Sequence, residues 1–177
     1  MQLTITEMKK MPNMYKNVVD ATMGAKSATL QKQVFDGKSG YTEGGGQKAA
    51  LAGDDLDDIM ESADIAYDIH SDKYGIKRTV KGIEKVNGSD AYVLETVNSK
   101  GKKATDYYDV ATGYMVKKIQ GEGEKQSITE FSDYKEVPGT GGYKMAYKVV
   151  QTQSGQTFPA TVESVEVNKG IAETEFK

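Results

Sequence analysis

The sequence predicts an α+β fold in which a large antiparallel sheet carries one short helix. Apolar and polar residues alternate along most of the chain, and the alternating segments follow one another about every 10–15 residues with short turns between them, which is typical of an antiparallel meander. One segment instead repeats its apolar residues with the period of a helix. We expect this helix to lie against one face of the sheet.

Turn residues separate the alternating segments. The clearest turn is Asn87-Gly88, because an Asn-Gly pair suits the positive φ angles of a two-residue hairpin loop, with Ser89 as an alternative third loop residue. The pattern predicts strands at Leu3–Met8, Tyr15–Val19, Ala28–Phe35, Lys77–Val86, Asp90–Val97, Ala104–Asp109, Tyr114–Gln120, Ser127–Glu136, Tyr143–Gln153 and Thr157–Val167.

The helical segment is Asp54–Ala63. Leu56, Ile59, Met60 and Ala63 recur at i, i+3, i+4 and i+7 and so form one face of a helix. Its first turns also hold several carboxylates, which the helix dipole favours at that end: Asp54, Asp55, Asp57 and Asp58.

Composition excludes several function classes. The 177 residues include no cysteine and one histidine, which rules out a disulfide framework, a thiolate metal site and most histidine-based catalysis. The net charge is −3 and Arg78 is the only arginine, which argues against nucleic acid as a partner. No apolar run reaches the roughly 18 residues that a membrane-spanning helix needs. We therefore expect no transmembrane segment and no cofactor.

Four motifs with possible chemistry have simpler interpretations. The acidic segment 54–64 lacks the ligand spacing of a calcium loop, and His70 has neither a nucleophile elbow nor a second histidine at metal-binding spacing. In Gly44-Gly-Gly46, Gln47 stands where a phosphate loop needs lysine, and Ser99–Lys102 falls in an expected hairpin turn. We interpret these as a solvated helix face, a surface histidine, a flexible connection and a chance match. No catalytic residue, no metal ligand and no enzymatic activity are predicted.

Tyrosine and methionine are frequent on the expected strands. The chain has 11 Tyr, 4 Phe and 8 Met. Tyrosine has an apolar body with a polar tip and methionine is flexible, so both suit the wall of an adaptable apolar cavity. Both also occur in ordinary sheets and cores, and the residue types alone leave the two interpretations open.

The order of strand and turn motifs resembles a known family. The motifs are Val80–Glu95, Thr105–Lys117 and Thr129–Gly139, together with Lys10-Met-Pro-Asn13 and Val34–Tyr41 in the first half. They resemble the LolA/LolB-like superfamily of outer-membrane lipoprotein carriers. The similarity is closer still to lipoprotein-sorting-like domains, including those appended to secreted insulinase-type zinc peptidases of Gram-negative bacteria.

This resemblance implies a more specific fold. The family has an unclosed antiparallel barrel whose concave apolar face is covered by helices that act as a lid over a cavity for acyl chains. We therefore expect a strongly curved antiparallel sheet, an unclosed β-barrel of about ten strands, with Leu56, Ile59, Met60 and Ala63 of the short helix on its concave face. Residues 1–177 should form a single LolA-like domain that lacks the family's N-terminal helix and first strand.

The resemblance also implies a function. We expect non-catalytic binding of a hydrophobic ligand, a lipid or a lipoprotein acyl chain, in the periplasm or at the outer membrane of a Gram-negative bacterium, with the signal outside this chain. The expected ligand-binding residues are Tyr92, Leu94, Tyr108, Met115, Phe131 and Met145, although alternation does not reveal which strand face is concave. The alternative is a structural accessory domain at the C-terminus of a secreted insulinase-type zinc peptidase, which contacts other protein domains and binds no ligand.

Overall fold

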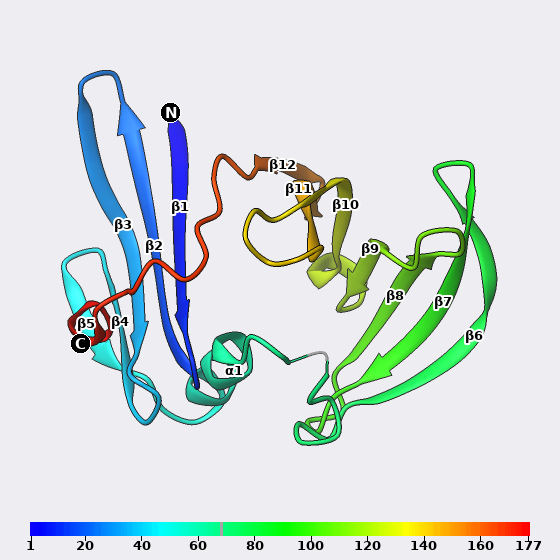
Figure 1. Ribbon diagram of the computed structural model, residues 1–177, viewed down its shortest axis with the longest axis horizontal. Coiled ribbons are helices and arrows are strands. Elements are labelled where there is room, and N and C mark those ends of the chain that lie inside the picture. Colours follow the sequence, from blue (N-terminus) through cyan, green and yellow to red (C-terminus); the bar gives the residue numbers. More distant parts are fainter. Residues whose placement is uncertain (68) are drawn as a thin grey trace. The chain divides into compact units, whose positions relative to one another are not determined.

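The computed structural model describes residues 1–67 and 69–177 of the chain (Figure 1). The chain forms two compact units. The first contains Met1–His70 together with the C-terminal segment Gly170–Lys177, and the second contains Ser71–Lys169. Each unit is built on one antiparallel sheet.

The first unit contains a five-stranded meander in the order β1-β2-β3-β4-β5, followed by the helix α1 (Asp54–Ala63). A short 3₁₀ helix, η2 (Glu173–Phe176), lies in its C-terminal segment. Its strands are β1 (Gln2–Lys10), β2 (Met14–Met23), β3 (Lys26–Phe35), β4 (Gly40–Gly44) and β5 (Gln47–Ala50).

The second unit contains a seven-stranded meander in the order β12-β11-β10-β9-β8-β7-β6. A short 3₁₀ helix, η1 (Gly123–Lys125), connects β9 with β10. Its strands are β6 (Lys77–Val86), β7 (Ser89–Val97), β8 (Lys103–Asp109), β9 (Met115–Gln120), β10 (Ser127–Glu136), β11 (Lys144–Gln153) and β12 (Gln156–Thr161).

The predicted fold class is confirmed, with corrections in detail. The described chain is mostly antiparallel strand with one short α-helix at the predicted bounds, and neither sheet closes on itself within residues 1–67 and 69–177. The interpretation of the glycine-rich segment as a flexible connection is wrong. Gly45 and Gly46, with φ angles of 57° and 78°, form the turn of a hairpin between β4 and β5. Ser89 does not lengthen the next hairpin loop, because it pairs with Val86.

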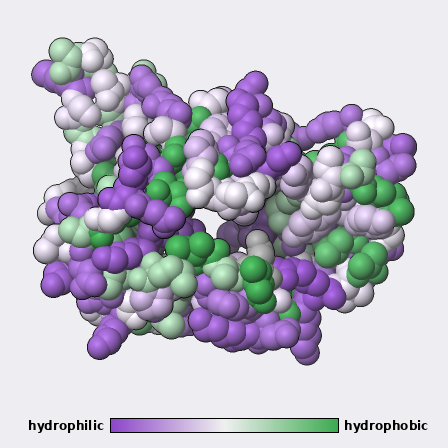
Figure 2. Space-filling view, viewed as in Figure 1, coloured by the Kyte–Doolittle hydropathy of each residue, from purple (hydrophilic) through white to green (hydrophobic). Residues whose placement is uncertain are grey.

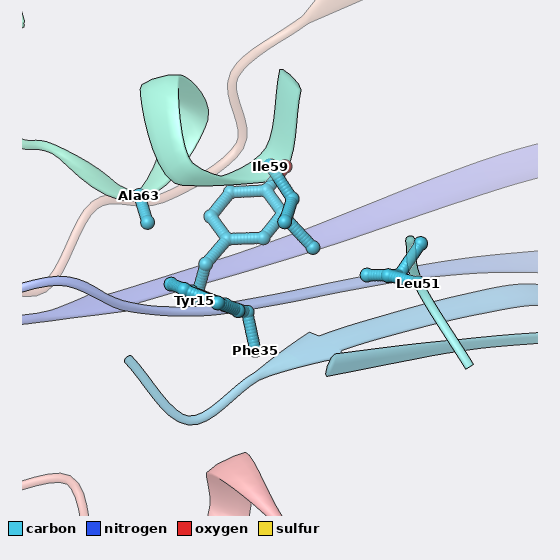
Figure 3. Packing of buried hydrophobic residues seen from close by; sticks show 5 residues of the cluster. All are labelled: Tyr15, Phe35, Leu51, Ile59 and Ala63. Atoms are coloured by element: carbon cyan, nitrogen blue, oxygen red, sulfur yellow. The ribbon is translucent and has the colours of Figure 1, made fainter. Parts of the chain in front are cut away.

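The core of the first unit lies between α1 and one face of the five-stranded sheet. Tyr15 of β2 pairs directly with Phe35 of β3, and Ile59 and Ala63 of α1 pack over this pair together with Leu51 (Figure 3). All five side chains are at most 8% exposed. The structure therefore places α1 as a cover over one end of this sheet face.

Close packing of this core depends on a glycine at position 40. A Cβ atom on Gly40 would lie 2.5 Å from the Val34 carbonyl oxygen and 2.8 Å from Leu51 Cδ1, so glycine allows Leu51 to approach the sheet.

Leu56 of α1 packs against the core as predicted, but Met60 is 41% exposed. The prediction that Met60 belongs to the buried helix face is therefore wrong.

The opposite face of the same sheet holds the C-terminal segment. Phe176 of η2 is 1% exposed, and the Lys16 ammonium on β2 donates to the Glu175 carboxylate at 2.6 Å. The Lys10 ammonium donates to the carbonyl oxygen of Ile171 at 2.9 Å. One aromatic anchor and two lysine contacts thus hold residues 170–177 on the sheet.

Replacing Phe35 with alanine is expected to lower the free energy of unfolding by about 3–5 kcal/mol, because a fully buried phenyl ring leaves a cavity. Phe158→Ala is the matched control, since this phenyl ring is 52% exposed and its loss should change stability by less than about 1 kcal/mol. Urea titration monitored by circular dichroism measures both. Equal losses of stability in the Phe35→Ala and Phe158→Ala variants would contradict the proposed core.

Replacing Phe176 with alanine is expected to release the C-terminal segment from the sheet. Amide hydrogens of residues 170–177 should exchange at least tenfold faster at pH 7, as measured by mass spectrometry. Thr174→Ala removes an exposed side chain from the same segment and should leave exchange unchanged. Unchanged exchange in the Phe176 variant would show that the aromatic anchor does not hold the segment.

Stability should also depend on pH through Glu175. The hydrogen bond from Lys16, together with its positive charge, holds the pKa of Glu175 below the usual glutamate value. The unfolded chain therefore binds the proton more readily than the folded chain. The stabilisation from the contact between Lys16 and Glu175 is present above the usual glutamate pKa and is lost as the pH falls through the lowered pKa of the folded chain. The stability difference between the wild type and Glu175→Gln should accordingly shrink between pH 7 and pH 3. Glu163→Gln is the control, and a difference that stays constant with pH would contradict the prediction.

Candidate functional site: an apolar face of the seven-stranded sheet

The two faces of the seven-stranded sheet differ in burial. Side chains that pair directly in antiparallel strands lie on the same face, so the strand register assigns each residue. One face, which we call the core face, holds Val93 paired with Tyr107, next to Ala91 and Val86. All four are at most 9% exposed, and Val116 and Ile119 pack against them. This face supplies the hydrophobic core of the second unit.

The other face collects apolar side chains from all seven strands. Ile83 pairs with Tyr92, Tyr92 pairs with Tyr108, and Tyr108 pairs with Met115. The face continues onto β10 because Lys118, which lies opposite Asp106, pairs with Thr129, and Phe131 is two residues further on. Phe131 pairs with Val149, and Val149 pairs with Ala160 at the far edge of the sheet. We call this set the apolar face: Val80, Ile83, Tyr92, Leu94, Tyr108, Met115, Phe131, Met145, Val149, Phe158 and Ala160.

Several large side chains of the apolar face are open to solvent. Val80 is 66% exposed, Ile83 57%, Phe158 52% and Tyr92 42%. Figure 2 shows hydrophobic residues reaching the molecular surface among hydrophilic ones. A single exposed residue of this kind is normal, whereas a contiguous group, such as Val80, Ile83 and Tyr92 on β6 and β7, marks a site of interaction. The apolar face is therefore the candidate functional site.

All six residues predicted to bind the ligand lie on the apolar face. Leu94, Tyr108, Met115, Phe131 and Met145 are half-buried, and Tyr92 is more exposed. Sequence reasoning missed five further members: Val80, Ile83, Val149, Phe158 and Ala160. Only the pairing register could have added them: Val80, Ile83 and Val149 lie opposite predicted members, and Ala160 and Phe158 continue the same face on β12. The binding role of the six, and the lid role of α1, remain predictions.

A polar group borders the apolar residues on the same face. Asp106 of β8 pairs with Leu94 on one side and with Lys118 of β9 on the other. Asp106 is 1% exposed and accepts a hydrogen bond of 2.6 Å from the Thr96 hydroxyl. The Lys118 ammonium lies 3.7 Å from its second oxygen, Oδ1. The apolar face thus carries a buried carboxylate beside a lysine.

A hollow of about 320 Å³ lies next to the core face, between the tip of the β6–β7 hairpin and β10. Its lining includes Tyr114 and Tyr134, whose rings stack with centroids 4.5 Å apart, and Phe131 also borders it. The Tyr134 hydroxyl donates to the carbonyl oxygen of Met115 at 2.6 Å, and burial raises the pKa of this phenol. The stacked pair of Tyr114, which precedes β9, and Tyr134 of β10 therefore forms part of the wall of this hollow.

His70 and the acidic segment 54–64 are the residues considered for catalysis or metal binding. His70 is exposed, and its Nδ1 lies 2.8 Å from the Asp64 carboxylate. Within residues 1–67 and 69–177, no three His, Asp or Glu side chains come close enough to hold a metal ion. In the same residues, no helix combines the length and apolar character needed to cross a membrane.

Comparison with known proteins identifies the fold. No family model and no curated protein matches the sequence. A DUF1329 family protein from Desulfovibrio piger superimposes with a TM-score of 0.59, covering 93% of this chain and 82% of that one at 14% identity. An outer membrane lipoprotein-sorting protein domain from Vibrio parahaemolyticus gives a TM-score of 0.55 over 92% of this chain and 81% of that one, at 16% identity.

A LolA superfamily protein from Nitrosomonas europaea gives a TM-score of 0.51, with 11% identity over 93% of this chain and 81% of that one. The chain has a LolA-like fold. At these identities the similarity concerns the fold alone. The LolA-like resemblance that the strand and turn motifs predicted is confirmed at this level, and the link to insulinase-type peptidases remains a prediction.

Proposed function

We propose that this LolA-like chain binds a hydrophobic ligand, a lipid or the acyl chain of a lipoprotein, on the apolar face of its seven-stranded sheet. The observation that carries the proposal is the exposure of Val80, Ile83, Tyr92 and Phe158 on one face, at 42–66% each. The core face already buries the residues that stabilise the unit. The apolar face is therefore free to contribute to binding.

Burial of an acyl chain would supply the favourable free energy of the complex. Each CH₂ group removed from water contributes about 0.8 kcal/mol, so ten groups on the apolar face would contribute about 8 kcal/mol before the cost of immobilising the chain. Met115 and Met145 are flexible enough to adapt to chains of different shape. Several aromatic rings offer flat contact surfaces of low conformational entropy: Tyr92, Tyr108, Phe131 and Phe158.

The proposed role is non-catalytic and located in the cell envelope. Transfer of a ligand between aqueous and apolar surroundings requires no reacting side chain, and the sequence contains no cysteine and one exposed histidine. Two structures of the same fold are described as an outer membrane lipoprotein-sorting protein domain and a LolA superfamily protein. These descriptions support a periplasmic or outer-membrane-associated location in a Gram-negative bacterium.

Titration with cis-parinaric acid, a fatty acid that fluoresces in apolar surroundings, tests the proposal. The wild type should give a saturable increase in fluorescence. Introducing charge with Val80→Lys and Ile83→Lys together should weaken binding at least tenfold, and both positions are exposed enough to tolerate lysine in the fold. Met23→Lys, at a position 65% exposed in the other unit, is the matched control and should bind normally.

Two outcomes would overturn this proposal. Absence of saturable binding by the folded wild type would favour the accessory-domain alternative, in which the apolar face contacts protein. Equal loss of binding in the Met23 variant would show that added positive charge, and not disruption of the apolar face, weakens binding. Circular dichroism confirms that each variant is folded.

A further inference from the structure

The two sheets of the described chain end in four edge strands: β1 and β5 in the first unit, β6 and β12 in the second. An exposed edge offers unpaired backbone N–H and C=O groups to any extended chain, and natural edges are protected by shortness, lysine, proline or a bulge. β5 is only four residues long, β12 contains Pro159, and β6 has a bulge at Lys81. These three edges therefore carry a protective device.

The N-terminal half of β1 carries no such device. Gln2–Thr6 contains no charged residue, and β1 pairs with β2 without a bulge along its whole length. Every residue of Gln2–Glu7 is exposed. Within residues 1–67 and 69–177, β2 is the only segment that forms backbone hydrogen bonds with this half-strand. Its outer edge is therefore available for pairing with another strand.

The side chains of this half-strand are apolar on one side of the sheet. Lys9 of β1 pairs with Tyr15, which α1 covers, and Leu3 and Ile5 lie on the same face as Lys9 because side chains alternate along a strand. Leu3 is 50% exposed and Ile5 is 60% exposed, and neither belongs to the core cluster under α1. A strand paired with this edge would bring its own side chains against both of them.

The sequence of this half-strand is complementary to itself in antiparallel pairing. With a two-fold axis at Thr4, Leu3 lies opposite Ile5 of the second copy, and the two threonines meet at the axis. Apolar residues then meet apolar residues, and the apolar sides of both copies lie on the same face. An axis at Ile5 or Thr6 would instead place Glu7 opposite an apolar residue. A second copy of this chain therefore fits the edge in one register.

We propose that two copies of this chain associate through antiparallel pairing of their β1 edges, with the two-fold axis at Thr4, so that their five-stranded sheets become one continuous sheet. Leu3 and Ile5 of both copies form an apolar cluster over the junction. The symmetry closes the assembly at two copies. The contact is small, so the association is weak and depends on concentration. The inference goes beyond the proposed function and concerns the other unit of the chain.

Sedimentation velocity between about 10 µM and about 1 mM protein measures this association. The wild type should shift from monomer to dimer over this range. Ile5→Lys should remain a monomer, because the lysine would lie opposite Leu3 of the second copy, and the position is exposed enough to tolerate the charge. Leu30→Lys is the matched control, since this residue is 48% exposed on β3, two strands from the edge, and the variant should dimerise like the wild type.

A cysteine at the axis tests the register, because the chain contains no other thiol. Side chains directly opposite one another in antiparallel strands have Cβ atoms about 5 Å apart, which is close enough for a disulfide. Mild oxidation with diamide should therefore convert Thr4→Cys into a covalent dimer. Thr6→Cys is the matched control on the same strand and face. Its two thiols would lie about 13 Å apart along the junction, so its covalent dimer should form at least tenfold more slowly.

Three outcomes would overturn the proposal. A wild type that stays monomeric up to about 1 mM would show that the β1 edge does not pair with a second copy. A dimer that persists in folded Ile5→Lys, and dissociates in the variant with Val80→Lys and Ile83→Lys, would show that the copies meet through the apolar face. Equal rates of disulfide formation in the Thr4 and Thr6 variants would contradict the register. Circular dichroism confirms that each variant is folded.

Discussion

The strand register of the seven-stranded sheet is the constraint on which the candidate site depends. Because side chains alternate between the two faces of a strand, a shift of the pairing by one residue would exchange the residues of the core face with those of the apolar face. Two bulges set this register. An extra residue at Lys81 makes Ile83, and not Gly82, the partner of Tyr92, and an extra residue at Val116 makes Met115 the partner of Tyr108. The bulges therefore bring Ile83 and Met115 to the apolar face and leave Val116 to pack with the core.

This arrangement separates the buried cores from the apolar face. In the second unit the core face buries Ala91, Val93 and Tyr107, so the apolar face can remain exposed without loss of the core. In the first unit the core forms where α1 covers Tyr15 and Phe35, and the C-terminal segment covers the opposite side of the same sheet. Substitutions in these cores should alter stability, and under the proposed function substitutions on the apolar face should alter binding. Asp106 is the exception, because it lies on the apolar face and is nevertheless buried.

Local patterns predicted those elements for which several sequence signals indicate the same structure. The bounds of α1 follow from apolar spacing and from carboxylates at its first turn, and the Asn87-Gly88 turn follows from its two positive φ angles. The strands β4 and β5 were missed because they are short and rich in glycine and polar residues. Met60 was misassigned because it lies at one edge of the apolar helix stripe and Ile59 at the other, and the sheet contacts the side that carries Ile59.

The sequence by itself determined the antiparallel class, the single helix, most of the strands and a pool of six residues that all lie on one face. These features depend on local alternation, turn chemistry and residue type, which act over a few neighbouring residues. The tertiary structure decided which neighbours complete the apolar face and which residues form the core. It also brought Asp106 and Lys118 together from different strands. Such pairings arise between segments that are distant in the chain, and a bulge of one residue reverses the face of every side chain that follows it, so no local pattern contains them.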